Sequence, residues 1–91
     1  MLGFLKNAVD MNAITERAIE KDVQKQVDVF MSKAADFIEI AAAKGEYNVS
    51  VIMSTARPEA VARIIEEFRD CDYTVEVEDH VDWHRFIIDW S

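Results

Sequence analysis

The chain has 91 residues, of which 51% are apolar and 31% are charged. It has room for one domain and is too apolar for a disordered tail. The net charge is −8, and residues 70–91 contribute −6 of it, since they hold seven acidic residues and one arginine. This charge argues against direct binding to nucleic acid or to an anionic membrane. No apolar run reaches the roughly 18–20 residues that span a bilayer, and the single cysteine, Cys71, fits a reducing compartment.

Residues 1–11 form a short N-terminal segment that lacks the pattern of a signal peptide. Residues 12–44 predict one long amphipathic helix, because neither glycine nor proline interrupts them and strong helix formers dominate. Asn12 or Asp10 can cap its start, and Gly45 stands where a helix ends in a left-handed residue.

Apolar residues recur along this predicted helix at alternating spacings of four and three, as in a heptad repeat. This seam consists of Val23, Val27, Phe30, Ala34, Phe37 and Ala41, and is broadened by Met31 and Ile38. Upstream, Glu16 and Glu20 occupy the positions that the seam requires. Either the helix breaks or bends near Glu20, or its first turns use a different face.

The length of the helix favours self-association. Thirty-three residues span roughly 50 Å, whereas a globular chain of this size is about 30 Å across. An unbroken helix therefore projects and exposes apolar side chains that a second chain has to cover. We expect a homo-oligomer, dimer or higher, with these interface residues: Val23, Val27, Phe30, Met31, Ala34 and Phe37.

Residues 47–90 predict the order β-α-β-β. Alternating apolar residues indicate strands near 47–54, 73–78 and 83–90, and Pro58 opens a helix whose apolar face includes Ile64 and Phe68. Residues 79–82 form a hairpin loop. The whole chain is then a single α+β domain, a two-layer sandwich of order α-β-α-β-β. Its three-stranded sheet is expected to be mixed, with the first two strands parallel after a right-handed crossover and the third antiparallel.

Three stretches carry a resemblance to a known group of proteins. They are Ile-Glu-Ile-Ala-Ala-Ala-Lys-Gly-Glu-Tyr-Asn-Val-Ser-Val at 38–51, Asp-Tyr-Thr-Val-Glu-Val at 72–77 and Phe-Ile-Ile-Asp-Trp-Ser at 86–91. In outline, residues 30–91 resemble small uncharacterised proteins of tailed bacteriophages. The resemblance implies phage origin, and with it the host cytoplasm or the virion, and transfers no functional residue. One departure is Cys71-Asp72 before Tyr73, where such chains often carry a glycine.

Residues 79–84 hold two histidines and two aspartates, which is the most concentrated set of candidate metal ligands. A hairpin can bring His80 and His84 together across its turn, but the same sequence is typical of a solvated loop. Residues 54–57 can bind an anion at a helix start or simply cap that helix. No glycine-rich phosphate loop or nucleophile motif is present. We therefore expect no catalytic residue, no metal and no cofactor, and predict that the protein is not an enzyme.

The outward face of the predicted sheet is the better candidate for a binding site. A tryptophan among apolar and acidic residues is typical of a protein-recognition patch, although scattered apolar exposure is also normal on small domains. The predicted partner-binding residues are Ile52, Glu76, Glu78, Trp83, Arg85 and Ile87.

The leading hypothesis is a non-enzymatic accessory protein that self-associates through its long helix and binds a host or phage protein. One alternative is a small structural component of a virion or assembly. Another is an oligomer that sequesters a small anionic ligand between subunits through Arg57, Arg63 or Arg85.

Overall fold

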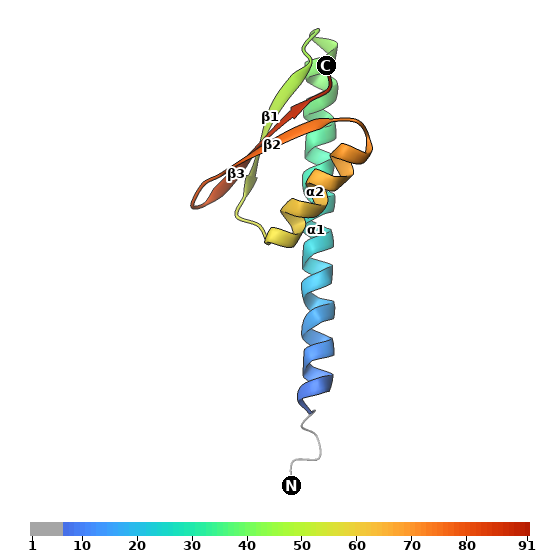
Figure 1. The fold of residues 1–91 in the computed structure, drawn as a ribbon, viewed down its shortest axis with the longest axis vertical. Coiled ribbons are helices and arrows are strands. Elements are labelled where there is room, and N and C mark those ends of the chain that lie inside the picture. The colour runs from blue at the N-terminus through green and yellow to red at the C-terminus, as the bar shows by residue number, and fades with distance from the viewer. Residues whose placement is uncertain (1–6) are drawn as a thin grey trace.

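The protein is an α+β fold in which a three-stranded sheet packs on two helices (Figure 1). The computed structural model describes residues 7–91, so most of the predicted N-terminal segment lies outside the described residues. The elements in chain order are α1 (Ala8–Ala43), β1 (Asn48–Ser54), α2 (Pro58–Asp70), β2 (Thr74–Asp79) and β3 (Trp83–Asp89). The predicted fold class and element order are confirmed.

Helix α1 is continuous over 36 residues. It begins one turn earlier than predicted, because the Asn7 side chain accepts a hydrogen bond from the Asp10 amide at 2.9 Å and caps the first turn. There is no break near Glu20. The helix ends as predicted before Gly45, whose φ of +83° favours a residue without a β-carbon.

The order of the strands is β1-β3-β2, and both hydrogen-bonded pairs are antiparallel. Strands β1 and β2 run in the same direction, as predicted, but β3 lies between them. The prediction of a mixed sheet is therefore wrong. A tight hairpin, closed by a hydrogen bond from the His80 amide to the Trp83 carbonyl at 2.9 Å, pairs β3 with β2. Strand β1 then pairs with the other edge of β3.

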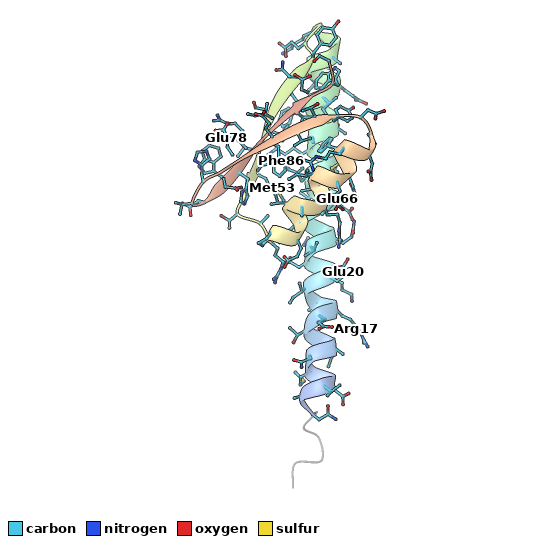
Figure 2. The ribbon with its side chains drawn as sticks, viewed as in Figure 1. Arg17, Glu20, Met53, Glu66, Glu78 and Phe86 are labelled. Atoms are coloured by element: carbon cyan, nitrogen blue, oxygen red, sulfur yellow. The ribbon has the colours of Figure 1, made fainter. Side chains whose placement is uncertain are left out.

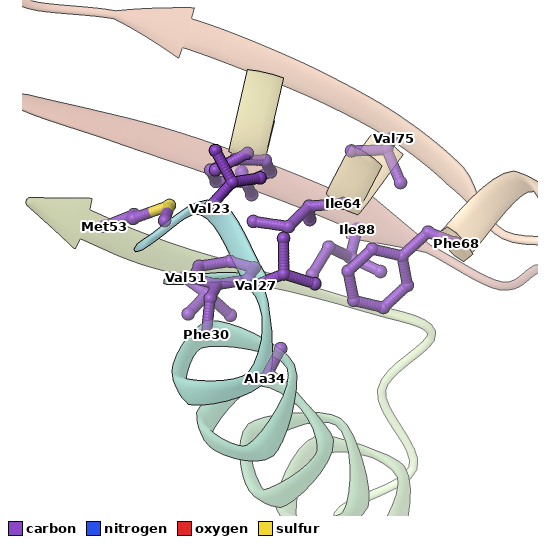
Figure 3. Packing of buried hydrophobic residues seen from close by; sticks show 12 residues of the cluster. Val23, Val27, Phe30, Ala34, Val51, Met53, Ile64, Phe68, Val75 and Ile88 are labelled. Atoms are coloured by element: carbon purple, nitrogen blue, oxygen red, sulfur yellow. The ribbon is translucent and has the colours of Figure 1, made fainter. Parts of the chain in front are cut away.

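The core lies between the inner face of the sheet and the two helices (Figure 3). Phe86 and Ile88 of β3 and Ile64 of α2 are fully buried there, and the ring of Phe30 lies 4.5 Å from that of Phe86. These contacts hold α1 under the sheet with its heptad seam turned inward.

The inward seam corrects the predicted oligomer interface. Val23, Val27, Phe30 and Ala34 are no more than 3% exposed and form the chain's own core, so no second chain can reach them in this fold. Met31 is partly buried against the same core, and Phe37 is 41% exposed. The helix finds its apolar partners within one chain because the sheet and α2 cover most of the seam.

The molecule is elongated, with extents of 68 × 26 × 17 Å. The first residue of α1 that packs on the core is Ile19, so residues 8–18 project from the body by about 16 Å (Figure 1). This projecting segment exposes Val9, Met11 and Ile14. Among the described residues, neither helix is long and apolar enough to cross a membrane.

Candidate functional site

Neither helix covers the outer face of the sheet. The strand register aligns side chains across it in rows: Ile52, Arg85 and Glu78 form one row, and Ser50, Ile87 and Glu76 form the next. In Figure 2, Glu78 lies on the side of the sheet away from α1 and α2, whereas Phe86 lies between the sheet and the helices. The alternation of each strand therefore gives one buried face and one free face.

Trp83 lies at the centre of a cluster at the hairpin end of this face. Its ring stacks on the His80 imidazole, with 3.9 Å between centroids and 16° between planes. The Arg85 guanidinium carbon lies 5.3 Å from the centre of the Trp83 ring. The Glu78 carboxylate reaches both neighbours, at 3.8 Å from His80 Nε2 and 3.7 Å from Arg85 Nη1. These contacts fix the orientation of a half-buried indole on an open surface.

The six predicted partner-binding residues all lie on this one face. We define the Trp83 patch by those six residues and the histidine that stacks on the indole: Ile52, Glu76, Glu78, His80, Trp83, Arg85 and Ile87. Ile52 is 48% exposed, and Trp83 and Ile87 are half-buried. The patch thus has Arg85 between two half-buried apolar residues on the central strand, with carboxylates along its β2 side.

His80 is the one member of the patch that the sequence does not predict. The sequence indicates a loop over residues 79–82, and strand alternation assigns no face to a loop residue. In the structure the turn is tighter, because the His80 amide donates to the Trp83 carbonyl at 2.9 Å. That pairing sets His80 directly across the hairpin from Trp83, so the two rings share a face. A prediction of a shorter hairpin loop, with residues 81 and 82 alone, would have placed His80 on the same face as Trp83.

His84, the second histidine of the predicted metal cluster, lies on the opposite face. Its Nδ1 is 2.7 Å from Asp79 Oδ1, and its buried Nε2 has no hydrogen-bond partner. The imidazole lines an apolar pocket of about 290 Å³ between the hairpin and α2. The prediction that a hairpin brings His80 and His84 together is wrong, because residues 80 and 84 point to opposite faces of the ribbon. Within residues 7–91, no group of three potential ligands is arranged for a metal ion.

All three arginines predicted for anion binding already have carboxylate partners, and that of Arg85 is Glu78 on the outer face. Arg57 Nε lies 2.7 Å from Asp22, and Arg63 binds Glu20 at 2.9 Å. The hydrogen bond from Arg63 lowers the pKa of Glu20, and that from Arg57 lowers the pKa of Asp22. These pairs join α2 to α1. They leave the start of α2 poorly suited to an added anion, since the Arg57 amide also donates to Gln26 at 3.0 Å.

Comparisons with protein-family models, with curated protein sequences and with solved structures give no match to this chain. The function therefore has to follow from the geometry of the chain itself.

Proposed function

We propose that this chain is a non-enzymatic accessory protein that binds another protein through the Trp83 patch. The observation that carries the proposal is the indole of Trp83, which His80 and Arg85 hold in place on a face that neither helix covers. An aromatic side chain that is already ordered loses little conformational entropy on binding. Tryptophan and arginine are also among the residues that most often dominate the energy of an interface.

The charges around the patch indicate the chemistry of the partner. Glu76 and Glu78 lie along the β2 side of the patch, and Asp82 lies in the hairpin loop. A complementary surface has an apolar pocket for the indole and lysine or arginine side chains at its rim. Electrostatic attraction of this kind mainly raises the association rate, so binding should weaken as the salt concentration rises.

The test is affinity capture from the native cells with two variants of the same hairpin. Trp83→Ala removes the anchor, whereas Val81→Ser changes a side chain that is 92% exposed at the tip and lies outside the patch. We expect a specific partner to be retained by the wild type and by Val81→Ser and lost by Trp83→Ala. The same retention by both variants would contradict the proposal, provided that circular dichroism shows both to be folded.

We also propose that the chain self-associates, as the length of its helix predicts. The exposed apolar residues of α1 support this part of the proposal, since Val29 is 62% exposed and Ile40 is 52% exposed. The buried seam has no part in it.

The resemblance to small phage proteins supports a phage origin, and we propose the host cytoplasm or the virion as the location. A structural component of a virion or assembly is the second candidate, which the projecting segment of α1 favours because Val9, Met11 and Ile14 are exposed on it. Detection of the protein in purified particles by mass spectrometry would support the second candidate over the first.

A further inference from the structure

An exposed stripe of α1 has a pattern that matches itself when it is reversed. The stripe consists of Val29, Lys33, Asp36 and Ile40, at spacings of four, three and four, so its members lie on one side of the helix. All four are exposed. In chain order the stripe runs apolar, positive, negative, apolar.

Two copies of this stripe complement each other in an antiparallel helix pair. Val29 of one copy then lies opposite Ile40 of the other, and Lys33 lies opposite Asp36. Because the arrangement is twofold symmetric, each of these contacts occurs twice. A parallel pair would instead place like charges opposite each other. For two copies of the chain, the charge pattern therefore favours an antiparallel over a parallel pair.

The surroundings of the stripe also suit a second copy. The Lys33 ammonium reaches the Ile52 carbonyl at 2.6 Å, which places the stripe beside the free edge of β1. A groove of about 340 Å³ lies there, with Val29, Lys33 and Ile52 in its lining. No residue of β1 is charged, whereas β2, the other edge strand, carries Glu76, Glu78 and Asp79. For a chain of net charge −8, two copies repel each other less on the β1 side of the sheet than on the β2 side.

We propose that two copies of this chain pair antiparallel through the α1 stripe, with Lys33 of each bound to Asp36 of the other. The inference rests on the proposed self-association and names its interface. At each end of the pair Lys25 approaches Lys44 of the second copy, which opposes association. The stripe also supplies only four side chains of each copy, whereas a standard interface has roughly 20–30 residues a side. The dimer is therefore weak and its formation depends on protein concentration.

The experiment measures mass by sedimentation equilibrium over a range of concentrations. Lys33→Glu alone and Asp36→Lys alone each place like charges opposite each other, and we expect each variant to be monomeric. An equimolar mixture of the two restores opposite charges across the pair, and we expect it to form a heterodimer. Changes within one helix cannot produce this recovery, because each chain in the mixture keeps its own substitution.

Three results would overturn the inference, and they separate it from the wider proposal. A monomeric wild type at every concentration contradicts self-association itself. A wild-type oligomer that both charge variants retain contradicts this interface alone. Loss of the oligomer in Val9→Asp but not in Ile40→Asp would assign the contact to the projecting segment. Capture by the Trp83 patch is independent of all three.

Discussion

At the scale of single residues, both helices end in the same motif with different residues at its left-handed position. After α1, the Glu46 amide donates to Ala41 and Gly45 has a φ of +83°. After α2, the Tyr73 amide donates to Phe68 and Asp72 has a φ of +67°. Gly45 could be predicted because glycine is the usual residue there. The role of Asp72 could not, since aspartate occurs in many kinds of turn.

We predict that Asp72→Gly stabilises the fold by roughly 0.5 kcal/mol. It relieves about 1–2 kcal/mol of left-handed strain and costs about 0.5–1 kcal/mol in the entropy of the unfolded chain. Gly45→Ala is the matched control and should destabilise by about 1 kcal/mol, because no atom lies within 4 Å of the added carbon and only the backbone strain acts. Urea unfolding measures both. If Asp72→Gly destabilises the fold, the interactions of the aspartate side chain contribute more to stability than the strain of its positive φ costs.

At the scale of elements, the heptad seam could be predicted from the sequence, but not what covers it. The periodicity shows that one face of the helix is apolar, but it does not show whether the same chain or another chain covers that face. The sheet and α2 supply the cover here. The strand order could not be predicted either. The alternation of apolar residues shows which side chains of a strand face the core, but not which strands are its neighbours.

Phe30 and Phe37 separate the two interpretations of the seam. Phe30 is 3% exposed beside Phe86, and Phe37 is 41% exposed. We expect Phe30→Ala to cost about 3–5 kcal/mol of unfolding free energy, independently of protein concentration, and Phe37→Ala to cost much less. Chemical denaturation at several concentrations checks this. A cost for Phe30→Ala that grows with concentration would mean that the residue also stabilises an oligomer.

The ion pairs between α1 and α2 predict a dependence of stability on pH. Arg63 and Arg57 lower the pKa of Glu20 and Asp22 in the folded chain. These two carboxylates therefore bind protons at a higher pH in the unfolded chain than in the folded chain. The contribution of the pairs is complete above pH 4.5, the ordinary value for Glu20, and is lost as the pH falls through the lowered values. We expect the double variant Glu20→Gln/Asp22→Asn to lose less thermal stability on acidification than the wild type. Glu16→Gln is the control. Equal losses of thermal stability in the double variant and the wild type would contradict the link between these ion pairs and the dependence on pH.

At the scale of the whole molecule, one end of α1 lies outside the body and one face of the sheet is bare. Arg17 lies on the projecting part of the helix in Figure 2. The sequence indicated a projection from the length of the helix, and it assigned the six partner-binding residues to one face by alternation. It could not supply the stacking of His80 or the separation of His80 from His84, since both depend on the hairpin turn.

The projecting segment should exchange its amide hydrogens quickly. Residues 8–18 have no core contact to oppose local unfolding, whereas residues 23–41 pack under the sheet. We expect hydrogen exchange to be much faster in the first range than in the second. Strong protection of residues 8–18 in a monomeric sample would show that the segment is covered in solution.

The most direct measurement of the central claim is hydroxyl-radical footprinting of the chain alone and in complex with its captured partner. The account predicts that labelling of Trp83, Ile52 and Ile87 falls in the complex, while labelling of Val81 and Tyr47 does not change. Undiminished labelling of Trp83, with protection elsewhere on the molecule, would contradict it.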